Sequence, residues 1–333
     1  MRALGLLVPS LAAFVLTRAA LLGQAAPPAP PAPSAPPAPP AAATDDKADE
    51  APKGRMEYFQ FESKVLAQSV NVGVYLPADY DHGEQRYPVV YFLHGLWLDA
   101  GSWEKRGTAA TLDKLIAAKE VGPMIVVCPD GKRDTMWVDW INGKGNWGEY
   151  VATELVKTID GKYRTLADRA TRHVSGESMG GYGALNAAFK HPDVFSAVST
   201  LSAAIYPIDP SQLPDRIKQF APRWEPVYGW PIEADHWKKW NPLELAATLP
   251  EESLKKLSIY FDCGDQDRYG FNVTNEQLHQ TLDKRAIPHE WHLRSGGHGH
   301  AYFEEYVGDS LRFHGAAFAA ATKGSGAKPA STR

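Results

Sequence analysis

The chain of 333 residues has only two cysteines, Cys128 and Cys263, which excludes a disulfide scaffold and a cysteine-rich zinc site. Both lie on segments that we expect to form strands separated by others, so we expect them to stay unpaired. The sequence also lacks a strong excess of either charge, since 35 Lys and Arg residues face 39 Asp and Glu residues. Nucleic-acid binding needs a basic field, and we therefore expect no nucleic-acid partner. No apolar run after residue 25 approaches the roughly 18 residues that a membrane-spanning helix needs.

The two ends of the chain have compositions that a folded core does not use. Residues 1–25 combine a basic start, a mostly apolar stretch and small residues at the end, which is typical of an export signal. An uncleaved membrane anchor is the alternative for this segment. Residues 26–54 open with nine prolines among small residues, as in an extended, disordered tether, and residues 323–333 resemble a disordered tail. We expect one folded domain over residues 55–322, in a secreted or periplasmic (cell-envelope) protein.

Between these ends, apolar segments with two different periods alternate along the chain. Residues 58–67 and 70–76 predict an antiparallel pair of strands. From residue 88 onward, buried strands alternate with amphipathic helices, which predicts an α/β fold with a mostly parallel central sheet and helices on both faces. The strands are expected at 88–93, 124–128, 172–177, 194–201, 257–263 and 289–293, and the helices at 108–120, 149–163, 179–189, 273–285 and 302–320. Residues 204–250, rich in Pro and Trp, predict an inserted cap.

One turn carries the strongest chemical signal. Residues 176–181 read Gly-Glu-Ser-Met-Gly-Gly between a predicted strand and a predicted helix, which is the G-x-S-x-G pattern in its usual context. The glycines let strand and helix approach closely, so that the Ser178 hydroxyl is exposed at the sheet edge. The N–H of Met179 would lie at the helix N-terminus, where it can stabilise an oxyanion. The pattern indicates Ser178 as a nucleophile; the alternative is a glycine-rich turn with a surface serine.

A serine nucleophile needs a base and an orienting carboxylate, which follow it along the chain in this architecture. Asp265 and Asp267 end a predicted buried strand, and either could be the acid. We favour Asp267 because it lies further past the strand, whereas Asp265 suits a turn cap. The glycine-rich segment 295–300 offers His298 as the base, with His300 in reserve. These residues lack a recognised metal-binding spacing, and we expect no metal and no cofactor.

The loop after the predicted strand 88–93 reads His94-Gly95-Leu96-Trp97. In this architecture that loop supplies the second oxyanion donor, and the N–H of Leu96 is the expected group. Gly95 allows the backbone to turn in close to the site. His94 is expected to pack beneath the site and to form hydrogen bonds there.

Ten tryptophans are present, and nine of them fall in segments that should surround the mouth of the site. Aromatic platforms suit a sugar face or an aryl acyl group. We expect the substrate to contact Gly95, Trp97, Trp137, Trp140 and His300. The alternative is that most of the tryptophans only hold the cap to the body.

With these residues placed, the chain resembles the esterase D family of secreted α/β-hydrolases over roughly residues 58–318. That family includes feruloyl and acetyl esterases, S-formylglutathione hydrolases and the antigen 85 group of mycolyltransferases. The resemblance rests on residues 94–96, 127–131, 150–165, 176–183, 191–195, 263–267 and 296–298. It implies an α/β-hydrolase fold in which Ser178, Asp267 and His298 form the triad and Leu96 and Met179 hold the oxyanion.

Two positions depart from the family pattern. Glu177 stands where members often carry Leu or Phe, and Gly299 followed by His300 stands where many carry an acid. Both departures leave the triad in place but alter the expected pocket.

These observations predict an exported serine carboxylesterase that works through an acyl-enzyme. The expected substrate is a small-molecule or carbohydrate ester with a short-chain or carbohydrate-linked acyl group. An acyltransferase that delivers the acyl group to a sugar is an open alternative, because its chemistry is identical up to the acyl-enzyme. A non-catalytic carbohydrate- or wall-binding module with this fold is a third reading, which the intact triad disfavours.

Overall fold

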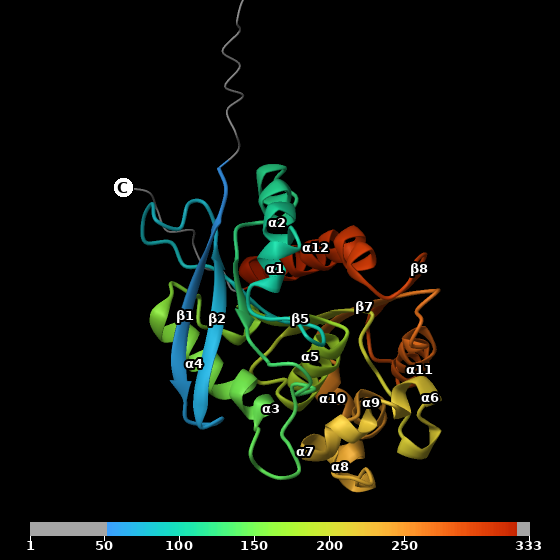
Figure 1. Cartoon of the computed structure of the whole chain (residues 1–333). Helices are drawn as coiled ribbons and strands as arrows, with labels where there is room; N and C mark the ends of the chain where they lie inside the picture. Colours follow the sequence, from blue (N-terminus) through green and yellow to red (C-terminus); the bar gives the residue numbers. More distant parts are fainter. Residues whose placement is uncertain (1–51, 325–333) are drawn as a thin grey trace, which may run out of the picture. The chain divides into compact units, whose positions relative to one another are not determined.

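The computed structural model describes residues 52–324 (Figure 1). The predicted export signal, the predicted tether up to residue 51 and the predicted tail from residue 325 lie outside these residues. Strand β1 starts at Arg55, and the last helix continues to Gly324, slightly beyond its predicted end. None of the helices in the described part is both long and apolar enough to cross a membrane.

The centre of the molecule is an eight-stranded sheet with the order β1-β2-β4-β3-β5-β6-β7-β8. The pairs β1–β2 and β2–β4 are antiparallel, and the remaining neighbours are parallel. The strands are β1 (Arg55–Ser63), β2 (Gln68–Leu76), β3 (Val89–Leu93), β4 (Ile125–Pro129), β5 (Arg172–Glu177), β6 (Ala197–Leu201), β7 (Ser258–Gly264) and β8 (Glu290–Arg294). The predicted antiparallel pair and the mostly parallel sheet are confirmed.

Helices connect these strands and cover the sheet. They are α1 (Ser102–Lys105), α2 (Thr108–Ala117), α3 (Trp147–Glu149), α4 (Val156–Lys162), α5 (Met179–Lys190), α6 (Asp215–Lys218), α7 (Glu225–Tyr228), α8 (Ala234–Lys239), α9 (Pro242–Thr248), α10 (Glu251–Leu254), α11 (Phe271–Lys284) and α12 (His300–Gly324). The helix predicted over 149–163 is interrupted by a π-helical segment, Tyr150–Leu155, between α3 and α4. Apolar periodicity does not reveal such a one-residue widening of a turn.

The central strands supply side chains to two separate cores, because successive side chains point to opposite faces of a sheet. On β4, Ile125 and Val127 join a core that includes residues of α4, α5 and α11. Val126 and Cys128 join a second core with residues of α2 and α12. Figure 1 shows α2 and α12 on one side of the sheet and α3, α5 and α7 to α10 on the other. Helices on both faces are thus confirmed.

The segment 204–250 lies between β6 and β7, as predicted, but is more regular than its composition suggests. It contains α6 to α9 and two short 3₁₀ turns, Pro210–Gln212 and Ala221–Trp224. Proline occupies an early position in several of these helices, where its missing N–H costs nothing. This cap lies over the carboxyl ends of the parallel strands and forms one wall of the cavity described below.

Cys128 on β4 and Cys263 on β7 are both buried and free. Three strands, β3, β5 and β6, separate them in the sheet. The expectation that they stay unpaired is therefore confirmed.

Candidate active site

Ser178 lies on the turn between β5 and α5, in a backbone conformation that non-glycine residues rarely adopt. Its φ is 53° and its ψ is −117°. The flanking glycines are required for this turn. A Cβ on Gly180 would lie 1.8 Å from the Leu93 carbonyl oxygen, and one on Gly176 would lie 2.3 Å from the Gly180 carbonyl oxygen. Close packing of strand and helix thus holds the Ser178 hydroxyl in place.

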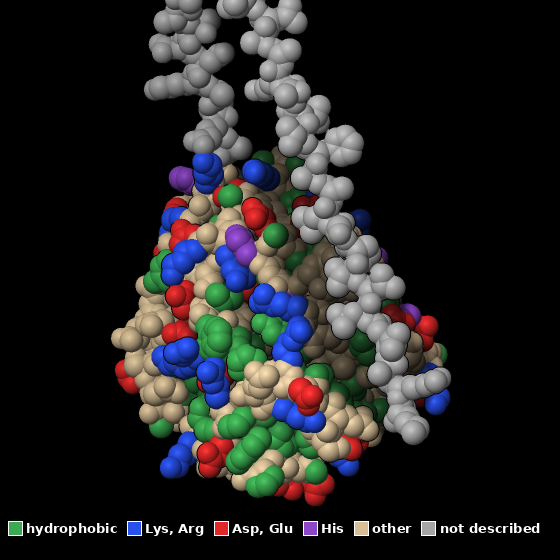
Figure 2. Space-filling view, turned by 45° about the vertical axis from the view of Figure 1, so that its right-hand side comes forward, with side chains coloured by type: hydrophobic (Ala, Val, Ile, Leu, Met, Phe, Trp, Pro, Cys, Tyr) green, Lys and Arg blue, Asp and Glu red, His purple; other side chains and the backbone are tan. Residues whose placement is uncertain are grey.

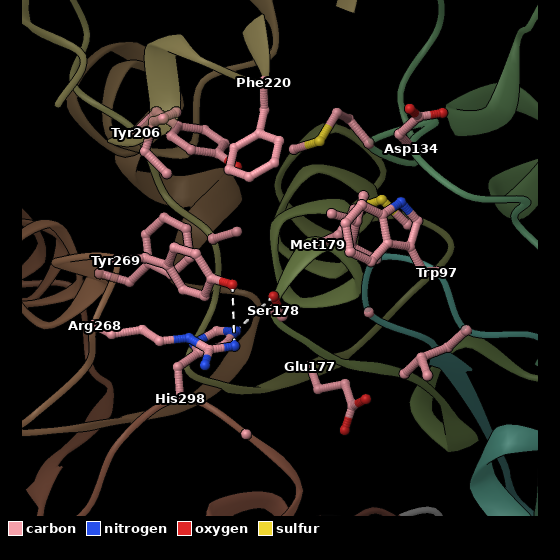
Figure 3. Close-up of a pocket in the computed structure, with 18 of the residues that line it drawn as sticks. Trp97, Asp134, Glu177, Ser178, Met179, Tyr206, Phe220, Arg268, Tyr269 and His298 are labelled. Atoms are coloured by element: carbon pink, nitrogen blue, oxygen red, sulfur yellow. Dashed lines mark hydrogen bonds between the residues drawn. The ribbon is translucent and has the colours of Figure 1, made fainter. Parts of the chain in front are cut away.

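The loop after β8 brings His298 to this hydroxyl. His298 Nε2 lies 2.9 Å from Ser178 Oγ (Figure 3). On the other side of the ring, His298 Nδ1 lies 2.8 Å from Asp267 Oδ2. A carboxylate only accepts hydrogen bonds, so Nδ1 carries the proton and Nε2 is free to accept the serine proton. The Asp267 side chain has no exposed surface. Three aromatic rings pack edge-on against the imidazole, those of Tyr269, Phe271 and Phe303.

The geometry separates the two acids that follow β7. Asp267 Oδ1 accepts the N–H of Tyr269 at 2.8 Å, which fixes the carboxylate while Oδ2 faces His298. Asp265 Oδ1 instead accepts the N–H of Gly296 at 3.0 Å. Asp265 therefore supports the loop that carries the histidine, and Asp267 contacts the histidine itself.

Two backbone N–H groups close to Ser178 lack an acceptor among the described residues. Leu96 lies in the loop after β3, and no acceptor among the described residues pairs with its N–H. Met179 is the first residue of α5, so its N–H has no partner within the helix. Beneath them, His94 Nε2 accepts the N–H of Gly131 at 2.9 Å, and His94 Nδ1 lies 2.8 Å from the Gly95 carbonyl oxygen. These two bonds define a neutral imidazole that braces the loop.

A cavity of about 240 Å³ opens above Ser178. Ser178, His298, Leu96 and Met179 line it together with residues of the cap and of the loop after β7. Seven aromatic side chains besides His298 line it, namely Trp97, Tyr206, Phe220, Trp224, Tyr269, Phe271 and Phe303. Figure 3 shows His298 and Tyr269 on one side of Ser178, and Met179 and Trp97 on the other. The cavity therefore places apolar side chains, many of them aromatic, next to the serine hydroxyl.

An ion pair lies at the base of this cavity. The buried Glu177 carboxylate accepts a hydrogen bond from the Arg106 guanidinium. Burial raises the pKa of Glu177, and the positive charge of Arg106 opposes this rise. The carboxylate beside Ser178, unusual for the family that the sequence resembles, is thus neutralised within the protein.

The expected substrate contacts divide into two groups. Gly95 and Trp97 line the cavity, and Trp97 is 51% exposed. Trp137 is only 1% exposed and donates its indole N–H to the His94 carbonyl oxygen, so it supports the loop from below. The expectation that Trp137 contacts substrate is wrong for this cavity.

Two further expected contacts also lie elsewhere. Trp140 donates its indole N–H to the Thr135 carbonyl oxygen, outside the cavity lining. His300 is exposed at the start of α12, with its Nε2 3.8 Å from Glu304. The cap residues Trp237 and Trp240 are buried as well, so most tryptophans stabilise the structure instead of lining the site.

Several lining residues were not found from the sequence. Arg268 and Tyr269 directly follow Asp267, and this position beside the acid is a signal that could have indicated them. Phe220 and Arg223 belong to the cap, where no periodicity shows which side chains face inward, whereas Trp224 is one of the nine tryptophans expected around the mouth of the site.

One cluster among the described residues could in principle hold a metal ion, and it lies outside this cavity. It consists of His279, Asp283 and His289. His279 Nδ1 and His289 Nε2 are already joined by a 2.7 Å hydrogen bond. His298, by contrast, has Asp267 and Ser178 as its hydrogen-bond partners and is not part of this cluster.

The parallel sheet, the strained serine turn and the contacts of Ser178, His298 and Asp267 define an α/β-hydrolase. The sequence model of a family described as "Putative esterase" matches residues 63–313, which is most of the chain. The chain therefore belongs to this esterase family.

Individual relatives agree with this assignment. The esterase Rv1288 of Mycobacterium tuberculosis is 27% identical over 274 residues, which cover 73% of this chain and 56% of that protein. An endo-1,4-beta-xylanase/feruloyl esterase of Xylanibacter ruminicola is 31% identical over 173 residues, or 50% of this chain and 23% of that protein. A solved ferulic acid esterase superposes with a TM-score of 0.68 at 27% identity, over 80% of this chain and 99% of that one. The chain spans about half the length, or less, of these two curated relatives.

Proposed function

We propose that this protein hydrolyses carboxylic esters through an acyl-enzyme formed on Ser178. The observation that carries the proposal is the continuous contact from Ser178 Oγ through His298 to the buried carboxylate of Asp267, at 2.9 and 2.8 Å. A hydroxyl is a weak nucleophile at neutral pH, and a neutral imidazole within bonding distance removes its proton as it attacks.

The reaction follows from this geometry in two halves. Ser178 Oγ attacks the ester carbonyl carbon, its proton passes to His298 Nε2, and the carbonyl oxygen becomes an anion. The N–H groups of Leu96 and Met179 stabilise that anion, and Asp267 stabilises the imidazolium. The tetrahedral adduct collapses, and His298 gives its proton to the departing alcohol. In the second half His298 takes a proton from water as the water oxygen attacks the acyl-enzyme carbonyl carbon. His298 then returns the proton to Ser178 Oγ, which releases the acid and restores Ser178.

The cavity suggests the kind of acyl group. Its aromatic walls suit a flat, apolar acyl chain, and its volume suits a short or aryl group better than a long lipid. Two relatives are named feruloyl esterase and ferulic acid esterase, which is an activity on an aryl acyl group. We therefore propose short-chain and aryl acyl esters, including carbohydrate-linked ones, as substrates.

The test compares purified wild-type protein with Ser178→Ala on para-nitrophenyl acetate, para-nitrophenyl butyrate and methyl ferulate. We expect Ser178→Ala to lose at least about 10³-fold in kcat/KM, because the acyl-enzyme cannot form. A fluorophosphonate probe should label the wild type and leave Ser178→Ala unlabelled. Ser211→Ala, an exposed cap serine outside the cavity, is the matched control and should retain both activities. Hydrolysis that persists in Ser178→Ala would overturn the proposal.

We also propose that the protein is exported. The support is the sequence of residues 1–25, which lie outside the described structure. The size of the mature protein in the culture medium or periplasmic fraction tests this proposal. Retention in the cytosol at full length would contradict it.

A further inference from the structure

The cavity above Ser178 contains more positive than negative charge. Three arginines line it, Arg106, Arg223 and Arg268, against two acids, Asp134 and Glu177. An apolar ester alone would gain nothing from guanidinium groups at this place. Figure 2 shows that on one face of the molecule basic, acidic and apolar side chains are interspersed, so the imbalance in the cavity does not continue a uniformly basic surface on that face.

The partners of these arginines differ. Arg106 is neutralised by Glu177. Neither Arg223 nor Arg268 forms an ion pair with any carboxylate in the described part of the chain. Asp134 likewise has no ion pair there, and Figure 3 shows it on the side of the cavity opposite Arg268. Arg223 and Arg268 are therefore the two cations available to a ligand.

Aromatic rings orient both of these guanidinium groups. The Arg268 guanidinium lies 5.0 Å from the Tyr269 ring centroid, and its Nη2 donates to the Tyr269 hydroxyl at 3.2 Å. The Arg223 guanidinium lies 5.7 Å from the Trp97 ring and 5.6 Å from the Phe220 ring. A stacked guanidinium is held in position while its N–H edge stays available for a carboxylate or phosphate.

Arg268 lies on the side of Ser178 where the alcohol part of an ester must lie. In the proposed mechanism His298 protonates the departing alcohol, so that oxygen lies on the His298 side of the serine. Tyr269 packs edge-on against His298 at 5.0 Å, and Arg268 is the preceding residue. Figure 3 shows the Arg268 side chain extending from this side toward Ser178 and His298.

We propose that the enzyme is selective for esters whose alcohol part carries an acidic group, a carboxylate or a phosphate, which the Arg268 guanidinium binds. The inference rests on the proposed function and adds its substrate class. The acid group forms charge-assisted hydrogen bonds with Arg268 while the acyl group occupies the aromatic part of the cavity. Arg223, on the Trp97 side, contributes to the positive field but does not contact the alcohol part.

The experiment measures a ratio, which separates charge recognition from catalysis. The probes are the acetyl esters para-acetoxybenzoate and para-acetoxyphenyl phosphate, each compared with the neutral para-acetoxybenzamide. The ratio of kcat/KM for an acidic over the neutral ester is determined for the wild type, Arg268→Gln and Arg223→Gln. Arg216→Gln is the matched control, since Arg216 is an exposed cap arginine outside the cavity lining. A second pair, mono-para-nitrophenyl glutarate against para-nitrophenyl valerate, places the acid on the acyl part.

We expect Arg268→Gln to lower the ratio for at least one acidic acetyl ester by about tenfold or more, as loss of a hydrogen bond to a charged group does. Whether the carboxylate or the phosphate probe is affected more identifies the acid. Arg216→Gln should leave the ratio at the wild-type value, and Arg223→Gln should lower it less than Arg268→Gln. Added salt should reduce the wild-type ratio and leave that of Arg268→Gln nearly constant.

Equal ratios in Arg268→Gln and Arg216→Gln would overturn the proposal. The proposal would also be overturned if only Arg223→Gln lowered the ratio of kcat/KM for acidic over neutral esters. The same holds if Arg268→Gln lowered this ratio only for the pair of esters with the acid on the acyl part. These results differ from failure of the proposed function, in which no ester would be hydrolysed in a Ser178-dependent manner. If only the Arg268 proposal fails, neutral esters would still be hydrolysed in a Ser178-dependent manner.

Discussion

At the residue scale, two carboxylates that lie two positions apart have different partners, and this difference is testable. Asp267→Asn keeps the shape of the side chain but replaces an acceptor by an amide, so His298 loses its orientation and the support for its positive charge. We expect kcat to fall by about 10³ to 10⁴-fold. Asp265→Asn retains an oxygen that can accept the Gly296 N–H, and its kcat should change by less than about tenfold. Steady-state kinetics on a nitrophenyl ester would measure both, and a larger loss in Asp265→Asn would refute the assignment.

The limits of sequence reasoning are also visible in single residues. Motif spacing predicted Ser178 and His298 as partners, and the structure brings their side chains to 2.9 Å. This prediction was possible because a G-x-S-x-G turn and a late glycine-rich histidine loop have few other uses. The choice between Asp265 and Asp267 stayed open, since both follow the same strand and only side-chain direction separates them. Trp137 was misassigned for a related reason. Residue type and position on the chain do not reveal whether a ring lies above or below a loop.

At the scale of elements, the contact between β3 and α5 depends on a missing side chain. Gly180→Ala would place a methyl group 1.8 Å from the Leu93 carbonyl oxygen, which is backbone and cannot move aside without displacing the strand. We expect a loss of at least about 3 kcal/mol in the free energy of unfolding, together with loss of esterase activity. Gly161→Ala in α4 is the matched control, because nothing lies within 4 Å of its added Cβ. That variant should be neutral or more stable by up to about 1 kcal/mol. Urea unfolding distinguishes the two, and a Gly180→Ala protein of wild-type stability would contradict the packing.

A buried acid joins β7 to α12. Asp262 accepts hydrogen bonds from the Tyr302 hydroxyl at 2.6 Å and from the Tyr260 hydroxyl at 2.9 Å. Burial raises the pKa of Asp262 to about 7, although both hydroxyl groups and the charge of Arg294 oppose the rise. Between its unfolded value, about 4, and this native value, the folded protein binds a proton that the unfolded chain does not. This acid's contribution to the free energy of unfolding therefore falls as the pH rises through that window.

Asp262→Asn removes this titration. From pH 5 to pH 8 the free energy of unfolding of the wild type should fall relative to that of Asp262→Asn, by about 2 to 3 kcal/mol, because about two pH units of this range lie below the native pKa. Urea unfolding of both proteins at a series of pH values measures the difference. Parallel pH profiles for the two proteins would show that Asp262 titrates at its ordinary value. Asp215→Asn, an exposed cap acid paired with Lys218, controls for the general effect of losing one carboxylate.

Elements with one clear period were predicted well. The strands at 88–93 and 124–128 were predicted from continuous apolar runs and the helix at 108–120 from its apolar spacing, and the structure confirms them. The helices within the cap were not predicted, because they are short, three of the four begin at or beside a proline, and they are stabilised by tertiary contacts among aromatic rings such as Tyr206, Trp224 and Trp237. Local propensity is weak in helices of four to seven residues, so their position depends on packing that no sequence window contains.

At the scale of the whole molecule, the strand order decides the chemistry of the two thiols. Four steps across the sheet separate β4 from β7, or about 19 Å at the usual spacing, whereas a disulfide requires Cα atoms within about 7 Å. Burial also raises the pKa of both thiols, which keeps them protonated and unreactive.

The full-length protein should consequently contain two free thiols that react only when the fold opens. Iodoacetamide should modify Cys128 and Cys263 slowly under native conditions and both rapidly in urea, as measured by intact mass. The urea midpoint should be the same with and without a reducing agent, since no covalent link exists to break. Cys263→Ser offers an internal check, because one thiol should then remain. A protein that yields no free thiol in urea until it is reduced would require β4 and β7 to be neighbours, and the sheet order on which the position of Ser178 and His298 depends would then be wrong.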